Sequence, residues 1–297
     1  MNMPNFLILG AAKAGTSSLS YYLQQHPQIY MSPLKEPKFF ALEDEMLDYQ
    51  GPDQGINHNS VTSIEEYRKL FEAVSTEIAI GEISPIYLYC SKAASRIKHY
   101  LPDVKLIVIL RNPVERAFSS FLHLVLAGYE DLSFSEALQA EEMRIAMKWA
   151  PLWHYKGKGF YYQQLEKYFD AFNSDQIKVY LYEDLYTNSM SLIKDIYQYL
   201  GVDHGFTPNL RKLNASSIPR SKLLHQLLTK DNFLKSALKP LLAKPFRTTI
   251  THKVKQLNLQ PKPELSSEVR QELLELYRDD IIQLQRLINK DLSLWLK

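Results

Sequence analysis

A glycine-containing loop directly behind an apolar run constrains the fold of this chain more than any other feature. Residues 6–9 read FLIL, and residues 10–19 read GAAKAGTSSL. A strand that ends in such a turn and opens a helix presents backbone N–H groups and the positive end of a helix dipole to an anion. Gly10 and Gly15 permit a close approach of the backbone, and residues 16–18 add hydroxyl donors. The loop therefore predicts a phosphate site.

The lysine of this loop is out of its usual place. In nucleotide triphosphatases a lysine directly precedes the Ser/Thr that holds magnesium, whereas here Thr16 stands at that position and Lys13 lies inside the loop. The apolar run 104–110 ends in Arg111 rather than in an aspartate that could hold a metal. A magnesium-dependent nucleotide kinase or triphosphatase is therefore the weaker interpretation. Arg111 instead predicts a second anion site at the same edge of the sheet.

Short apolar runs alternate with amphipathic segments, which is the pattern of a parallel sheet with helical crossovers. Strands are predicted at residues 5–9, 77–80, 104–110 and 176–182. Helices are predicted at residues 16–25, 90–100, 113–126, 133–148, 161–172 and 189–200. Asn112 and Pro113 suit the start of the helix 113–126, and Gly201 suits the end of the helix 189–200. We expect an α/β, P-loop-like three-layer fold with a central parallel sheet flanked by helices.

Three further segments complete the single domain that we expect for residues 1–297. Residues 41–62 are polar and contain glycine and proline, which predicts a long surface loop. Residues 220–258 contain nine Lys/Arg and one Asp. They form either a solvated helical face or a docking surface for an anionic substrate, carrier or membrane. Residues 266–290 have the spacing of an amphipathic helix, which we expect to pack on the domain rather than to form a coiled coil.

Composition argues against several classes of protein. A net charge of +2 at pH 7 gives no general case for binding nucleic acid. The only cysteine, Cys90, excludes an internal disulfide framework, and the eight histidines show no zinc-binding spacing with it. No run approaches the roughly 18 apolar residues of a membrane span, and no positive charge precedes the short apolar run near the N-terminus. We therefore expect a cytoplasmic protein without a transmembrane segment.

Two long segments resemble the phosphate-binding segments of sulfotransferases. FLILGAAKAGTSSLSYYLQQHPQI, followed by KEPKFF, is similar to their 5'-phosphosulfate-binding segment, and LIVILRNPVERAFSSFLH is similar to their 3'-phosphate-binding segment. Weaker likeness continues in GEISPIYLY, GFYYQQLEKYF, IKVYLYEDL and INKDLSLWL. The heparan-sulfate type and its bacterial relatives are the most similar. The resemblance implies 3'-phosphoadenosine 5'-phosphosulfate (PAPS) as donor, 3'-phosphoadenosine 5'-phosphate (PAP) as product, and no metal.

The resemblance also implies which residues bind the donor. Lys13 would stabilise the leaving 5'-phosphate, which the residues after it would help to hold: Ala14, Gly15, Thr16, Ser17 and Ser18. Arg111 and Ser119 match the pair that binds the 3'-phosphate. Arg220 lies where a loop would close over the adenosine and would contact a phosphate there.

The acceptor must lose a proton as it attacks, so a general base is required. Glu36 matches the catalytic glutamate of the heparan-sulfate type; its other interpretation is a carboxylate paired with Lys35 or Lys38. His123 is the competing base, or else a core histidine. In GEISP, Ile83 stands where relatives commonly carry a lysine, which weakens an assignment to glycosaminoglycans.

The acceptor and the assembly remain open at this point. A hydroxyl or amine of a carbohydrate, a glycolipid or a secondary metabolite would fit the reaction. A non-catalytic module that binds polyanions through residues 220–258 is the remaining alternative, but it leaves both phosphate motifs without a purpose. The sequence gives no preference for an oligomeric state.

Overall fold

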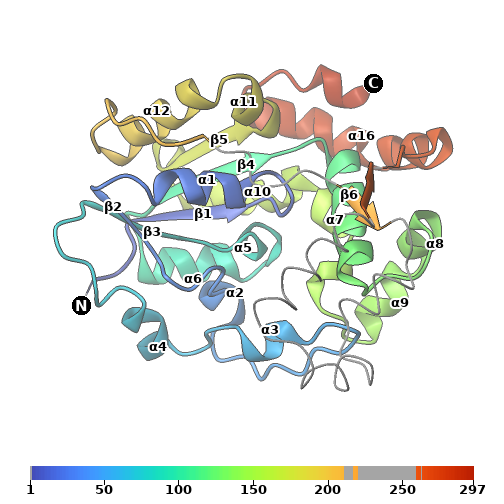
Figure 1. Ribbon diagram of the computed structural model, residues 1–297, viewed down its shortest axis with the longest axis horizontal. Helices are drawn as coiled ribbons and strands as arrows, with labels where there is room; N and C mark the ends of the chain where they lie inside the picture. The colour runs from blue at the N-terminus through green and yellow to red at the C-terminus, as the bar shows by residue number, and fades with distance from the viewer. Residues whose placement is uncertain (1, 211–216, 220–258, 262) are drawn as a thin grey trace, which may run out of the picture.

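The computed structural model describes residues 2–210, 217–219, 259–261 and 263–297 (Figure 1). A five-stranded sheet lies at the centre, and its strand order is β2-β3-β1-β4-β5. The strands are β1 (Phe6–Gly10), β2 (Ile29–Met31), β3 (Ala79–Ile83), β4 (Lys105–Leu110) and β5 (Ile177–Leu181). All neighbouring pairs in it are parallel. The predicted α/β fold with a central parallel sheet flanked by helices is confirmed.

The two central strands are buried on both sides. Residues 6–9 in β1 and 106–110 in β4 are fully shielded from solvent, as expected for a parallel sheet with helices on each face. The neighbours β3 and β4 lie on opposite sides of β1, so the chain reverses its direction across the sheet beside β1. In open α/β sheets, ligands bind beyond the carboxyl ends of the strands at such a point.

Helices cover both faces of the sheet (Figure 1). Right-handed crossovers place α1 (Thr16–Leu23) on the face opposite α6 (Ala93–Tyr100) and α10 (Tyr161–Ala171), because the connections run across the sheet in opposite directions. Directly after α1, the ring of His26 packs 4.6 Å from that of Tyr197 on α12 (Ser189–Leu200). On the other face, Tyr168 of α10 donates a hydrogen bond to the carbonyl of Tyr87 at 2.8 Å.

Predicted helix ends are confirmed at two places. The side chain of Asn112 accepts hydrogen bonds from the first turn of α7 (Pro113–Ala127), whose first residue is proline. Helix α12 ends at Gly201, whose φ of 79° suits the left-handed conformation that glycine adopts readily.

The other elements are short, apart from one long helix near the C-terminus. They are α2 (Phe39–Leu42), α3 (Gly55–His58), α4 (Ile64–Lys69), α5 (Ile86–Tyr89), α8 (Phe134–Gln139), α9 (Glu141–Ala146), α11 (Tyr182–Thr187), α16 (Ser267–Ile288), the 3-10 helices η1 (Pro151–Trp153), η2 (Gly157–Gly159), η3 (Ser174–Gln176) and η4 (Ser293–Leu296), and the antiparallel pair β6 (Ser217–Pro219) and β7 (Leu259–Pro261). Asp280 of α16 accepts hydrogen bonds from two backbone N–H groups at the start of α10, and thereby fixes α16 on the body of the protein.

Three predicted segments were wrong in part. The single helix at 133–148 is two helices, α8 and α9, and Arg144 in the second is turned inward to a buried ion pair with Glu130 at 2.6 Å. Residues 41–62 are not one long loop, because they contain the end of the buried helix α2 and the helix α3. The strand predicted at 77–80 lies at Ala79–Ile83, and the three-residue strand β2 was not predicted at all. The basic segment 220–258 lies outside the described residues.

Candidate active site at the carboxyl edge of the sheet

The turn between β1 and α1 is shaped for a ligand at its backbone. Gly15 is the N-cap of α1, its φ is 89°, and a Cβ there would lie 2.6 Å from Cδ2 of Leu185. Only glycine fits both constraints. No side chain within the described residues caps this helix. The N–H of Ser18 donates to the carbonyl of Gly15 at 3.0 Å, which leaves the N–H groups of Thr16 and Ser17 for an anion. Ala14, Thr16 and Ser18 are buried, whereas Ser17 is half-buried.

Three cationic side chains gather around this turn. Arg111 donates a hydrogen bond from Nη1 to the carbonyl oxygen of Lys13 at 3.2 Å, and Lys35 donates from Nζ to Oγ of Ser17 at 2.9 Å. Burial lowers the pKa of Lys13, and the nearby charges of Arg111 and Lys35 lower it further. The Nζ of Lys13 has no ion-pair partner among the residues that the structure describes. Among the described residues only Arg111 of the three has a carboxylate partner, Glu115, so the cluster carries an excess of positive charge, which is the electrostatic signature of an anion site.

Arg111 is held from several sides. Its guanidinium lies over the ring of Tyr182, 4.5 Å from the centroid, and its carbonyl oxygen accepts a hydrogen bond from the hydroxyl of Tyr161 at 3.0 Å. Glu115 lies 3.7 Å from Nη2 of Arg111 and also pairs with Arg270 at the start of α16. Because one face of the guanidinium is stacked, its orientation toward the turn between β1 and α1 is restricted.

Glu36 lies beside these cations and lacks an ion pair of its own. Lys38 donates from Nζ to the carbonyl oxygen of Glu36 at 2.8 Å rather than to its carboxylate, and Lys35 binds Ser17 instead. No lysine, arginine or histidine within the described ranges forms an ion pair with the Glu36 carboxylate. The negative charge of Glu36 nevertheless raises the pKa of Lys13. The alternative in which Glu36 is paired with Lys35 or Lys38 is therefore not supported by the contacts.

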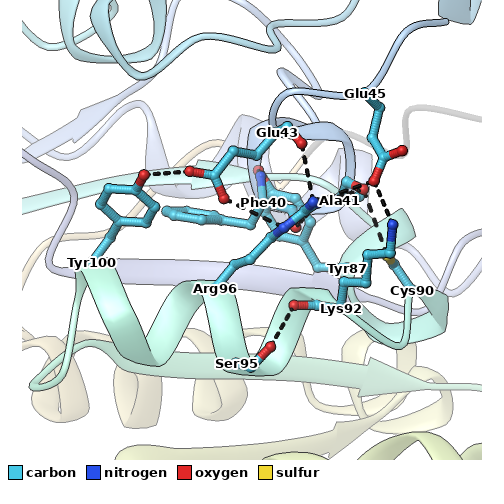
Figure 2. Close-up of polar contacts among 10 residues, drawn as sticks. All are labelled: Phe40, Ala41, Glu43, Glu45, Tyr87, Cys90, Lys92, Ser95, Arg96 and Tyr100. Atoms are coloured by element: carbon cyan, nitrogen blue, oxygen red, sulfur yellow. Dashed lines mark hydrogen bonds and ion pairs between the residues drawn. The ribbon is translucent and has the colours of Figure 1, made fainter.

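The chain behind Glu36 is tied to helix α6 (Figure 2). Arg96 donates hydrogen bonds to the carbonyl oxygens of Phe40, Ala41 and Glu43, at 3.4, 3.1 and 3.0 Å. It also forms an ion pair with the carboxylate of Glu43, which accepts a further hydrogen bond from Tyr100. One guanidinium thus fixes the backbone that leads away from the site.

Ser119 and His123 lie one turn apart on α7 and share a face of that helix. The His123 side chain is exposed, yet the protein atoms around it, and then the charges of Lys13 and Lys35, lower the pKa of His123 to about 4. The structure therefore brings His123 near the turn between β1 and α1. It does so as a neutral imidazole at pH 7 and not as a buried core histidine.

Some site residues escaped prediction, and one predicted residue is not described. Arg220 lies outside the described residues. Tyr182 and Lys35 were missed, although Tyr182 directly follows the strand beside Arg111, and parallel strands end at one edge of a sheet. The position of Tyr182 at the end of the strand next to that of Arg111 is the signal from which it could have been predicted. The hydrogen bond from Lys35 to Ser17 has no counterpart in the spacing of the sequence.

Comparison with known proteins decides the family. Residues 4–208 match the family described as the sulfotransferase family. The chain belongs to the sulfotransferase family. The crystal structure of a sulfotransferase from Alicyclobacillus acidocaldarius is 34% identical, covers 100% of both chains and matches with a TM-score of 0.80. The sulfotransferase domain of the Synechococcus PCC 7002 olefin synthase matches with a TM-score of 0.50 at 15% identity, over 98% of this chain and 96% of its own, and shows the fold alone.

The curated sulfotransferases that the chain matches are much longer than the chain itself. The bifunctional heparan sulfate N-deacetylase/N-sulfotransferase 4 of Mus musculus is 26% identical over 100% of this chain and 31% of its own length. The membrane-associated sulfotransferase kil1 of Dictyostelium discoideum is 36% identical over 40% of this chain and 22% of its own length. The chain thus spans less than a third of either relative. The predicted resemblance to sulfotransferases is confirmed, and the protein is an enzyme of that family.

The described residues lack two features, a membrane-spanning helix and a metal-binding cluster. Within residues 2–210, 217–219, 259–261 and 263–297, no helix is long and apolar enough to cross a membrane. In the same ranges no group of three or more His, Cys, Asp or Glu is arranged to hold a metal ion.

Proposed function

We propose that this sulfotransferase moves the sulfuryl group of PAPS to a hydroxyl or amine of an acceptor, and that Lys13 and Glu36 carry the chemistry. The observation that supports this most directly is the convergence of Lys13, Lys35 and Arg111 on the uncapped start of α1, with Glu36 beside them. A donor with two separate anionic groups fits two separate sets of cationic and backbone donors.

The donor would lie across the edge of the sheet. The residues from Lys13 to Ser18 would hold the 5'-phosphosulfate, because the turn there offers backbone N–H groups and a positive helix end. Arg111, together with Ser119, would hold the 3'-phosphate. Arg111 already donates to the carbonyl of Lys13, so the two phosphate sites are mechanically linked.

The reaction needs charge stabilisation on one side and a base on the other. The acceptor O–H or N–H would give its proton to the Glu36 carboxylate as the new bond to sulfur forms. The bond between sulfur and the 5'-phosphate oxygen would break, and Lys13 would stabilise the charge that gathers on that oxygen. His123 is the weaker candidate for the base, because Glu36 matches the catalytic glutamate of the heparan-sulfate type, whereas His123 is supported only by its place near Lys13 and Lys35.

The acceptor is proposed only as a class. A carbohydrate, a glycolipid or a secondary metabolite with a free hydroxyl or amine fits the reaction. The similarity to a heparan sulfate N-sulfotransferase supports testing amines, whereas the buried side chain of Ile83 supplies no positive charge for a charged glycan at that position. A cytoplasmic location and a single domain over residues 1–297 also stay predictions.

Calorimetric titration with PAP, beside ADP with magnesium, tests the donor site. We expect micromolar or tighter binding of PAP without magnesium, and much weaker binding of ADP. A preference for ADP with magnesium would favour a nucleotide kinase or triphosphatase instead.

Transfer from [35S]PAPS tests the reaction itself. Three acceptors cover the proposed classes: p-nitrophenol, N-deacetylated heparosan oligosaccharides and galactosylceramide. We expect label on at least one of them, and loss of that label in Glu36→Gln with unchanged affinity for PAP. Full transfer by Glu36→Gln would show that Glu36 is not the base, and His123 would become the candidate.

A further inference from the structure

A buried carboxylate next to the site has no ion-pair partner among the described residues. Glu82, in β3, is completely shielded from solvent, and no ion pair to it is found in the part of the chain that the structure describes. Its partners are hydroxyl groups: Tyr67 donates to Oε1 at 3.2 Å, and Ser84 donates to Oε2 at 3.0 Å. Burying a carboxylate without a cation is costly, so the fold retains this group at a stability disadvantage.

The hydrogen bonds of Glu82 lead directly to the segment that carries Glu36. Oγ of Ser84, which donates to Glu82, accepts a hydrogen bond from the backbone N–H of Lys38 at 3.0 Å. A second, longer route passes through Tyr87, which donates to Glu82. The hydroxyl oxygen of Tyr87 accepts a hydrogen bond from the N–H of Phe40 at 3.5 Å (Figure 2). Both routes end on the backbone within four residues of Glu36.

The segment needs such support because its backbone is strained. Glu36 and Lys38, on either side of Pro37, have φ of 57° and 62°, in the left-handed region that side chains disfavour by about 1 kcal/mol or more each. Without an external hold, these residues would relax to extended or helical conformations, and the direction of the Glu36 side chain would change with them. The bond from Lys38 to Ser84 supplies that hold.

We propose that Glu82 is a positioning residue, which acts through Ser84 to fix the backbone at Lys38 and so to aim the Glu36 carboxylate at the acceptor. The inference rests on the proposed role of Glu36 as the base. An ionised Glu82 only accepts hydrogen bonds, so it orients the Ser84 hydroxyl toward itself and leaves the Ser84 oxygen free to accept from Lys38. Protonation of Glu82 adds a donor that competes for the same oxygen.

The ionisation of Glu82 should therefore be visible in turnover. Burial raises the pKa of Glu82 to about 7, although hydrogen bonds from Tyr87, Ser84 and Tyr67 lower it, and the negative charge of Glu36 raises it again. Lys38 is the other charged group that faces it, and β1 presents only apolar side chains. Turnover should fall as the pH drops through about 7 and Glu82 takes up its proton.

Two variants disrupt the hydrogen bonds that link Glu82, Ser84 and Lys38 and change the shape of the side chains little. Ser84→Ala deletes the bridging hydroxyl, Glu82→Gln keeps the volume but not the charge, and Ser84→Thr restores the hydroxyl. Tyr180→Phe is the matched control, since it also deletes a hydroxyl that donates to a carboxylate, at 2.6 Å to Asp195, but on β5 and away from Glu36. Hydrogen exchange at single-amide resolution reports the Lys38 N–H directly and needs no acceptor.

Ser84→Ala should speed exchange at the Lys38 amide at least tenfold and lower turnover about 10- to 100-fold, the cost of a misplaced catalytic group. Affinity for PAP should stay within about twofold, and Ser84→Thr should recover most of the turnover. Glu82→Gln should lose the fall in turnover below pH 7, whereas Tyr180→Phe should keep it. Turnover is measured on whichever of the three acceptors named above is labelled.

Unchanged exchange at Lys38 in Ser84→Ala would overturn the inference, and so would wild-type turnover in that variant. Equal losses of turnover in Ser84→Ala and Tyr180→Phe would also overturn it, because the loss would then reflect a general loss of stability. Failure of the proposed function looks different: Glu36→Gln would then transfer sulfate normally, whatever the exchange rate at Lys38.

Discussion

Arg111→Met offers the sharpest separation of the two proposed phosphate sites. The substitution keeps most of the aliphatic stem and removes the guanidinium, which lies over the ring of Tyr182, carries one bond to Lys13 and would carry the 3'-phosphate. PAP has both phosphates and adenosine 5'-monophosphate has only the first. Their two affinities therefore report the two losses separately.

The magnitudes follow from the contacts. The bond to the Lys13 carbonyl has a neutral acceptor, so its loss costs about 1 kcal/mol of binding free energy. The affinity for each ligand should then fall about fivefold, because both ligands bind the same loop. A bond between a guanidinium and a phosphate contributes about 1.5–3 kcal/mol. The affinity for PAP should therefore fall by a further 10- to 150-fold, whereas the affinity for adenosine 5'-monophosphate should not. The preference for PAP should fall by that second factor alone.

Calorimetric titration of both ligands into wild type and variant measures this preference. Tyr182→Phe is the control, because it keeps the aromatic ring beneath Arg111 and should leave the preference within about twofold. If Arg111→Met lowers the affinity for both ligands by the same factor, Arg111 acts only through the turn between β1 and α1. The 3'-phosphate would then be bound elsewhere.

Lys13→Ala should lower kcat by about 10²–10³ with little change in the KM for PAPS, because its charge acts mainly on the leaving group; steady-state kinetics with a raised KM and unchanged kcat would contradict this. Glu130→Gln leaves Arg144 buried without its partner and should cost about 3–5 kcal/mol in urea unfolding at pH 7. Burial alone would raise the pKa of Glu130, but hydrogen bonds, chiefly from Arg144, hold it below 4.5, so wild type should lose this advantage as the pH falls through that lower pKa. Burial raises the pKa of Asp280 from 3.8 to about 6, so its contribution to stability is lost as the pH rises across that window. Asp280→Asn should therefore gain up to about 3 kcal/mol relative to wild type at pH 8, and an equal gain at pH 4 would refute the reasoning.

Local signals explain which parts of the fold could be predicted from the sequence. The runs that became β1, β4 and β5 are apolar because both faces of a parallel sheet are covered, and the caps at Asn112 and Gly201 depend on neighbouring residues only. The break between α8 and α9 had no such signal. Arg144 there turns inward to Glu130, a partner 14 residues earlier whose position is set by tertiary packing.

The same distinction divides the candidate site. Gly15, Lys13 and Arg111 follow strands of the sheet, so their place at its carboxyl edge could be inferred before their contacts were known. The support of Glu36 could not, because it depends on how segments 46 residues apart meet: Ser84 leaves the end of β3 as Lys38 passes it. A hydroxyl after a strand is common and a buried glutamate has no periodic signature. The chain of bonds through Lys38 and Ser84 is the reason that we propose for a carboxyl group in this dry interior, and that reason would lie in the reaction rather than in stability.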